Sequence, residues 1–208
     1  MTTGALSEPQ DSREFEQLLS RVRAETDRRG AKADRMELEA LARDCGPGAR
    51  DALAAVLAES GRPLWAQEMA AFALGCAGDR RAFETLVFLL NYRDPLRGAT
   101  AAHALVRLRD PRTARAAAAL ATNELRTAYA LHPVRVLVAL RAPESVPALV
   151  SLLGRLLDGP GPHWPLALAC VEGLGRIGDA RARPVLRDAA VHHRLRPAAQ
   201  AALARAGG

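Results

Sequence analysis

Residues 69–90 read MAAFALGCAGDRRAFETLVFLL, and residues 169–190 read ACVEGLGRIGDARARPVLRDAA. Both stretches contain an Ala-rich apolar segment, a Gly-Asp pair and a second apolar segment, in that order. Glycine tolerates the left-handed conformation that ends a helix, and aspartate accepts backbone N–H bonds where the next helix begins. Each stretch therefore predicts two helices joined by a short turn.

The same pattern recurs along the chain at a nearly constant period. Each recurrence has an Ala-rich segment that ends in leucine, and successive leucines are separated by 33, 31, 35, 34 and 29 residues. A single hairpin cannot bury its apolar stripe alone, so this period predicts hairpins that stack on one another. The aligned leucines are Leu41, Leu74, Leu105, Leu140, Leu174 and Leu203.

The composition favours helices over strands. Of the 208 residues, 49% are hydrophobic but only 4% are aromatic. Ala, Leu and Arg dominate from Arg50 onward and are among the strongest helix formers, whereas sandwiches and barrels use β-branched and aromatic residues in their strands. The length suits one domain or one repeat array, and we expect an all-helical chain.

The segments GCAGDRRAFETLVFLL and LGRIGDARARPVL resemble the short HEAT-like repeats that are named after phycobilisome lyases. The resemblance covers residues 33–206 and implies an all-α fold, a right-handed, armadillo-like α-solenoid of about five helical hairpins. In such arrays the second helices line a concave face that binds partners. RLRDPRT at residues 107–113 and DGPGPHWP at residues 158–165 depart from the repeat, so regular stacking is least expected there.

The two ends of the chain differ from the repeats. We expect residues 1–10 to be disordered and residues 11–30 to form a capping helix, with Phe15, Leu18, Leu19 and Val22 on the side that covers the first hairpin. Residues 31–206 would form the repeat array, in one domain with the cap, and the array would close on a half repeat.

Candidate partner-binding residues lie on the predicted concave face and in the loops between hairpins. Arginine offers two-pronged contacts to carboxylate or phosphate, and loops on a rigid scaffold often recognise partners. The tryptophan in the Gly-Pro loop is either an exposed anchor or a plug under the loop. The candidates are Arg81, Glu84, Phe88, Arg112, Arg115, Arg155 and Arg181 on the face, and Tyr92 and Trp164 in the loops.

The net charge of +6 raises nucleic acid as a partner, because basic surfaces neutralise phosphates. However, only one of the 29 basic residues is a lysine, Lys32, which is the bias expected from a GC-rich genome. The charge is also uneven, since residues 1–60 carry 12 acidic and 9 basic residues, while residues 61–208 carry 11 and 20. The basic character therefore belongs to the body of the chain.

The sequence contains no recognisable catalytic, cofactor-binding or metal-binding motif. The five histidines have neither HxxxH nor HExxH spacing, and the three cysteines are too far apart for a CxxC site. We therefore predict no enzyme activity, no cofactor and no metal. The cysteine usage and the lack of a signal peptide or an apolar span favour a cytoplasmic location and no membrane partner.

Three classes of function remain compatible with the sequence. The first is a non-catalytic scaffold or adaptor that binds another protein or peptide. The second is a nucleic-acid-binding repeat protein similar to the DNA-alkylation-repair glycosylases. The third, which the family resemblance implies, is a bilin lyase-like chaperone for a group attached to a protein.

Overall fold

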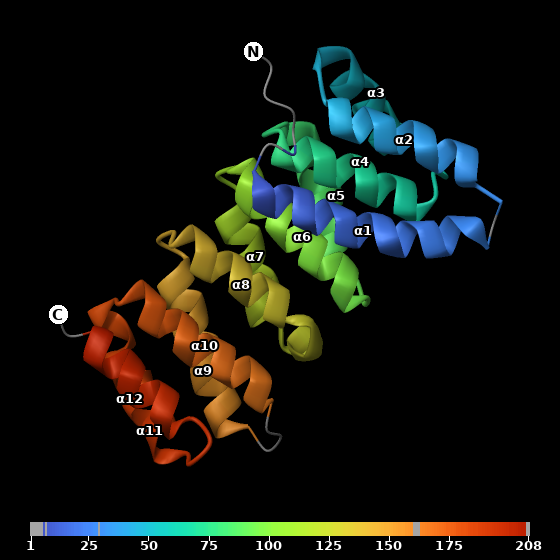
Figure 1. Cartoon of the computed structure of the whole chain (residues 1–208). Coiled ribbons are helices and arrows are strands. Elements are labelled where there is room, and N and C mark those ends of the chain that lie inside the picture. The colour runs from blue at the N-terminus through green and yellow to red at the C-terminus, as the bar shows by residue number, and fades with distance from the viewer. Residues whose placement is uncertain (1–5, 7, 29, 160–162, 207–208) are drawn as a thin grey trace. The chain divides into compact units, whose positions relative to one another are not determined.

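The computed structural model describes residues 6, 8–28, 30–159 and 163–206, and every regular element within those residues is a helix (Figure 1). The prediction of an all-α fold is confirmed. Most of the segment predicted to be disordered, residues 1–10, lies outside the described residues, as does the final Gly-Gly. The first helix begins at Pro9 and ends at Asp27.

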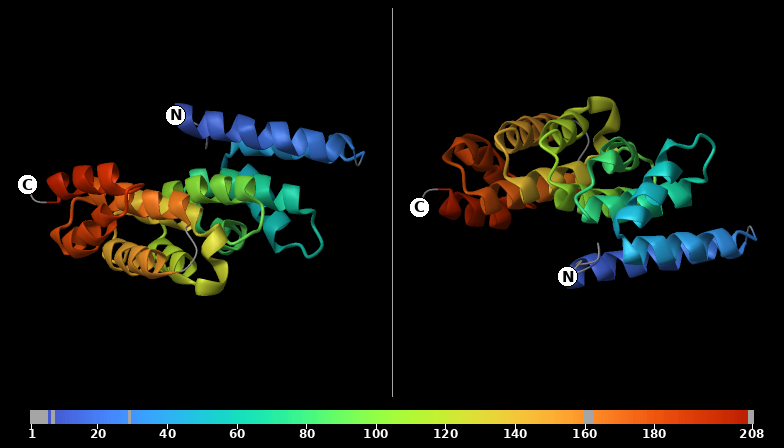
Figure 2. Two further views of the ribbon diagram at one scale, coloured as in Figure 1. Left: turned by 90° about the horizontal axis from the view of Figure 1, so that it is seen from below. Right: turned by 90° about the horizontal axis from the view of Figure 1, so that it is seen from above.

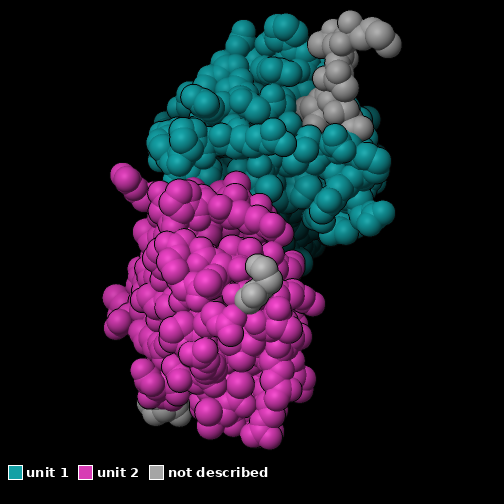
Figure 3. All heavy atoms as spheres, turned by 90° about the vertical axis from the view of Figure 1, so that its left-hand side faces the viewer, with its two compact units in different colours: residues 1–113 teal, residues 114–208 magenta. Residues whose placement is uncertain are grey.

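The chain consists of two compact units, residues 1–113 and residues 114–208 (Figure 3). Unit 1 contains α1 Pro9–Asp27, α2 Lys32–Asp44, α3 Pro47–Ala58, α4 Leu64–Cys76, the short 3-10 helix η1 Arg80–Ala82, α5 Phe83–Leu90 and α6 Pro95–Leu108. Helix α7, Thr113–Thr122, begins at the boundary. Unit 2 continues with η2 Glu124–Tyr129, α8 Leu131–Leu140, α9 Ser145–Asp158, α10 Trp164–Ile177, η3 Ala180–Ala182, α11 Arg183–Val191 and α12 Arg196–Arg205.

Within each unit, the first helices of successive hairpins pack side by side. Helix α4 contacts α2 and α6 in unit 1, and α10 contacts α8 and α12 in unit 2. Small residues permit this approach, because a Cβ added at Gly75 would lie 3.0 Å from the Cβ of Ala104, and one added at Gly175 would lie 2.7 Å from the Cβ of Ala202. The many alanines and glycines thus allow close helix packing.

The hairpins turn on residues in the left-handed conformation. Two of these residues are the expected glycines, Gly78 and Gly178, with φ of 74° and 77°. The others are Cys45, Arg109 and Arg141, with φ of 46°, 52° and 50°. The segment RLRDPRT therefore makes the same kind of turn as the Gly-Asp segments, although it lacks glycine.

In the fourth hairpin, the alignment on Leu140 is wrong by one helical turn. Leu140 is half-buried, whereas Leu137 is completely buried. The backbone N–H of the left-handed Arg141 donates to the carbonyl of Leu137, as that of Gly178 donates to Leu174. The segment RVLVAL has apolar residues three positions apart, and both fit one stripe of a helix, so the pattern alone could not separate them.

Helix α1 lies across the face that α4 and α6 form in unit 1 (Figure 2). The four residues predicted on its apolar side are all buried, namely Phe15, Leu18, Leu19 and Val22. The ring of Phe15 stacks on Phe72 of α4 at a centroid distance of 5.9 Å, and Phe72 stacks on His103 of α6 at 5.8 Å. This ring stack joins three helices.

Candidate functional site

Arg81, Arg112 and Arg181 occupy equivalent positions, two residues after the aspartate of a turn. Each turn aspartate accepts a hydrogen bond from the backbone N–H of its arginine, at 3.0, 2.9 and 2.8 Å respectively. The guanidinium of the same arginine bonds the carboxylate, with an Nε–Oδ1 distance of 3.0 Å in all three turns. The arginine therefore closes the turn from which the second helix starts.

These contacts lower the pKa of the turn aspartates. The hydrogen bond from the arginine side chain is the largest cause, and the one from the arginine backbone N–H acts in the same direction. The pKa of Asp179 falls to about 2. The carboxylates are ionised at neutral pH, so much of the positive charge predicted for binding is neutralised within the turns.

Two of the three arginines also bind the preceding hairpin of unit 1. Arg81 reaches Asp51 of α3 at 2.8 Å, and Arg112 reaches Glu84 of α5 at 3.1 Å. The guanidinium of Arg112 also lies 3.9 Å from the ring centroid of Phe83. Three predicted partner-binding residues, Arg81, Arg112 and Glu84, therefore make contacts between hairpins.

Two further predicted basic residues, Arg115 and Arg155, do not extend this row. Arg115 lies six residues after its turn residue rather than three, so it has a different position on the hairpin. Arg155 donates to the carbonyl of Thr122 at 2.7 Å and thereby caps the end of α7. Within the row, Arg181 pairs with the aspartate of its own turn. Its side chain is 65% exposed, so its outer surface remains accessible.

Phe88 and Tyr92, which the sequence places on two different candidate surfaces, lie together. Phe88 is on α5 and Tyr92 follows that helix, and their ring centroids are 5.7 Å apart. The two residues are 53% and 37% exposed. Arg93 follows Tyr92 directly, Leu96 comes three residues after Arg93, and both are exposed. The structure thus brings the two rings together, and the basic residue Arg93 is next to Tyr92 in the sequence.

Trp164 is half-buried and does not project freely from its loop. The centroid of its ring lies 5.7 Å from that of the His192 ring. The Cζ atom of Arg194 lies 5.8 Å from the centroid of the Trp164 ring. The residues between Gly159 and His163, within the inserted loop, lie outside the described part. Trp164 therefore packs on the turn after α11.

Open grooves lie between neighbouring helices of unit 2. The first lies between α7 and α9, has a volume of about 570 Å³, and is lined by Arg115 and Glu144 among small apolar residues. The second lies between α8 and α10, has a volume of about 560 Å³, and has Arg135, Glu172 and Arg176 among its lining residues. Both grooves combine an apolar lining with charged side chains.

Charge is distributed differently in the two units. Residues 1–113 contain 17 acidic and 17 basic residues, whereas residues 114–208 contain 6 acidic and 12 basic ones. The entire net charge therefore belongs to unit 2. This separation of charge is sharper than the one at residue 60.

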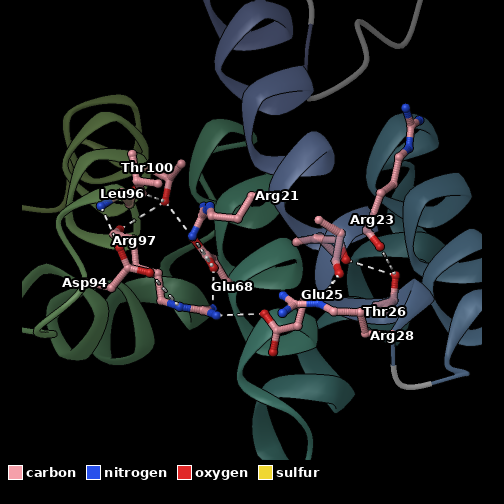
Figure 4. Close-up of polar contacts among 12 residues, drawn as sticks. Arg21, Arg23, Glu25, Thr26, Arg28, Glu68, Asp94, Leu96, Arg97 and Thr100 are labelled. Atoms are coloured by element: carbon pink, nitrogen blue, oxygen red, sulfur yellow. Dashed lines mark hydrogen bonds and ion pairs between the residues drawn. The ribbon is translucent and has the colours of Figure 1, made fainter.

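A buried polar cluster fixes α1 to the repeats of unit 1 (Figure 4). Glu68 of α4, which is 2% exposed, binds Arg21 of α1 at 2.6 Å, Arg97 of α6 at 2.6 Å and the hydroxyl of Thr100 at 2.8 Å. Arg97 also binds Glu25 of α1 at 2.9 Å. Sequence reasoning missed this cluster, because its members come from three helices far apart in the chain.

A second buried cluster contains Asp11, Cys76, His103 and Arg107. His103 Nε2 lies 2.7 Å from Asp11 Oδ1, and Arg107 Nε lies 3.2 Å from Asp11 Oδ2. Ligand atoms of Asp11, Cys76 and His103 all lie within 4.8 Å of one another. This cluster also joins α1, α4 and α6, and no motif in the sequence indicated it.

The three cysteine thiols are unsuited to act as nucleophiles. All three are buried, and burial raises the pKa of each thiol, that of Cys170 to about 12. A thiol with such a pKa is protonated at neutral pH, and the thiolate is the reactive form. The structure thus offers no activated cysteine among these residues.

Repeated helical hairpins, a shared turn and contacts through small residues define an all-helical repeat protein. Residues 166–192, which include most of α10 and all of η3 and α11, match the family model of the PBS lyase HEAT-like repeat. That segment is a HEAT-like repeat, and the match supports the predicted assignment of the chain. No curated protein matches it in sequence. None of its described helices has both the length and the apolar character needed to cross a membrane.

Proposed function

We propose that this HEAT-like repeat protein is a non-catalytic scaffold that binds another protein through the surface formed by Phe88 and Tyr92. The observation that carries the proposal is the contact between these two exposed rings. Aromatic residues supply a large share of binding energy at protein interfaces, and Tyr and Arg are enriched among the residues that matter most. Burial of both rings by a partner would also remove apolar surface from water.

The surface around this aromatic pair is preorganised. Helix α5 is anchored in unit 1 by buried residues on its opposite side, Phe83, Leu86, Leu89 and Leu90. A partner would therefore meet rings that are already held in place, which lowers the conformational cost of binding. We expect an apolar side chain of the partner against the rings and a carboxylate near Arg93.

A pull-down from native lysate with the double variant Phe88→Ala, Tyr92→Ala tests the proposal. We expect the variant to fold normally, since both side chains are exposed, and to lose at least about tenfold in affinity for the captured protein. Leu125→Ala is the matched control, because Leu125 is 93% exposed and lies in unit 2. Equal capture by the double variant and the control would contradict the proposal.

The charge of unit 2 favours nucleic acid as a second candidate ligand. Its 12 basic residues against 6 acidic ones would support binding that weakens steeply with salt. The same pull-down, repeated with nuclease, separates the two functions. Proteins that survive digestion support the scaffold, whereas retained nucleic acid with salt-dependent affinity supports a repeat protein that binds phosphate.

The third hypothesis, a chaperone for a protein-attached bilin, has its support in the description of the matching family model. That match covers one repeat and names no binding residue of this chain. A change in the absorption spectrum of a tetrapyrrole on mixing with the protein would support it.

A further inference from the structure

We propose that Asp11, Cys76 and His103 form a binding site for a divalent transition metal, of which zinc is the best match. The three residues come from α1, α4 and α6 respectively. Their ligand atoms lie within 4.8 Å of one another, and they form the one group of this kind found among the described residues. Asp11 and Cys76 are buried, and the His103 side chain is 14% exposed.

The donor atoms suit a borderline-soft metal. Zinc binds thiolate, imidazole nitrogen and carboxylate oxygen, whereas magnesium and calcium prefer oxygen alone. With bond lengths of about 2.0 to 2.3 Å, the ligands of a tetrahedral zinc lie roughly 3.3 to 3.8 Å apart. To complete a three-ligand site with water in the fourth position, His103 Nε2 and Asp11 Oδ1, now 2.7 Å apart, would have to separate slightly. Ligand atoms that are now up to 4.8 Å apart would have to approach one another.

Unsatisfied polar atoms in the cluster favour a further ligand. Asp11 is 0% exposed, yet its Oδ2 has no hydrogen-bond partner. Arg107 Nε lies 3.2 Å from that oxygen, but it is not aligned for a hydrogen bond and is itself without one. Asp11 Oδ2 therefore has a charged neighbour but no aligned hydrogen-bond donor, and a metal ion would supply the missing partner.

The charges of the site would balance when the metal binds. A divalent ion offsets the Asp11 carboxylate and the Cys76 thiolate, and the thiol proton leaves to solvent. Arg107 is the neighbouring group that opposes a cation. Its side chain is 33% exposed, so the guanidinium can turn toward water once the metal neutralises Asp11.

The site would link α1 to the repeats. Asp11 stands in the first turn of α1, and both other ligands belong to the face on which α1 lies. Metal binding would therefore hold the first turn of α1, in addition to the ion pair between Arg21 of α1 and Glu68 of α4. We expect the metal to stabilise the docked position of α1.

Titration of the EDTA-treated full-length protein with Co²⁺ tests the proposal. We expect one equivalent to bind, with thiolate-to-cobalt charge-transfer absorption in the near ultraviolet, and we expect Cys76→Ser to abolish that absorption. Cys170→Ser is the matched control, since Cys170 is also a buried thiol but lies in unit 2, and it should retain the absorption. No absorption in the original protein, or equal absorption in the Cys76→Ser variant, would overturn the proposal.

Thermal unfolding with Zn²⁺ provides a second readout that does not depend on the thiol spectrum. With free metal at about one hundred times its dissociation constant, Tm should rise by about 5 °C or more in the original protein and in Cys170→Ser. It should not rise in Asp11→Asn. Because each variant is compared with itself before metal addition, a loss of stability from the substitution alone cannot imitate this result, and an equal rise in Asp11→Asn would contradict the site.

Discussion

At the scale of single residues, Asp79, Asp110 and Asp179 show how one side chain can define a repeat turn. Each accepts a hydrogen bond from the backbone N–H of the arginine two residues later, just before the second helix, and also binds the side chain of that arginine. This explains why the Gly-Asp pair was the strongest signal in the sequence. It also explains why Arg109 can replace glycine, because the aspartate contacts still form when the left-handed residue is not glycine.

The lowered pKa of Asp179 leads to a pH-dependent stability. The unfolded chain should have an aspartate pKa of about 3.9, so it binds the proton more readily than the folded protein does. The stabilising contribution is therefore complete above about pH 4 and is lost as the pH falls toward about 2, the pKa of Asp179 in the folded protein.

Asp179→Asn should weaken that dependence, because asparagine keeps the cap without the charge. Acid unfolding followed by circular dichroism checks this, with Asp188→Asn, an exposed position on α11, as the control. We expect a shallower loss of stability between about pH 4 and 2 in Asp179→Asn than in the control. Identical acid profiles would show that the turn contact does not contribute.

The corrected register of the fourth hairpin predicts unequal effects of two neighbouring leucines. Leu137→Ala should lower the free energy of unfolding by about 2 to 5 kcal/mol, because Leu137 is completely buried. Leu140→Ala should cost much less, since that side chain is half-buried. Urea unfolding of both variants measures the difference, and an equal or larger loss for Leu140 would restore the original alignment.

At the scale of elements, glycine determines how closely α10 approaches α12. A Cβ at Gly175 would lie 2.7 Å from the Cβ and 2.8 Å from the Cα of Ala202, so the helix backbones would have to move apart. Gly154 in α9 has nothing within 4 Å of its added Cβ. The same substitution should therefore have opposite effects at the two positions.

Gly175→Ala should destabilise the protein by about 1 to 3 kcal/mol, as overpacking does. Gly154→Ala should be neutral or should stabilise by about 0.4 to 1 kcal/mol, because alanine favours helix and restricts the unfolded chain. Thermal and urea unfolding compare the two variants. Tolerance of alanine at position 175 would contradict the close packing of α10 on α12.

The docking of α1 depends on Glu68 as well as on apolar burial. Glu68→Gln removes the charge that Arg21 and Arg97 share, and breaking such a buried pair costs about 3 to 5 kcal/mol. We expect faster hydrogen exchange of the α1 amides. Glu59→Gln, which breaks the exposed pair with Arg62, should cost about 1 kcal/mol or less and leave α1 protected. Equal exchange in both variants would exclude this role of Glu68.

At the scale of the whole molecule, the sequence predicted the repeats better than the site. Local signals such as the Gly-Asp turns and the leucine period determine hairpins, because each acts within a few residues. The clusters around Glu68 and Asp11 join helices that are distant in sequence, so no spacing rule reveals them. The sequence predicted the arginines of the row as candidates. It did not predict that Arg81 and Arg112 form ion pairs with the preceding hairpin.

The contact between Phe88 and Tyr92 also could not be predicted from the spacing of residues in the sequence. Phe88 and Tyr92 were predicted as candidates on separate surfaces, Phe88 on a helix face and Tyr92 in a loop. The sequence positions of the two residues do not show that their rings are in contact. Their contact required the end of α5 to be known. It turns two weak candidates into the surface on which the proposed scaffold function rests.

Photo-cross-linking from position 92 tests that function most directly. Tyr92 would be replaced by the photoreactive residue p-benzoylphenylalanine, and Tyr129, a tyrosine of unit 2 that is 36% exposed, would be replaced in the control protein. After irradiation in native lysate, we expect a defined protein partner to be linked through position 92 and not through position 129, and the added substitution Phe88→Ala to abolish the product. A partner linked through position 129 and not through position 92 would contradict the account.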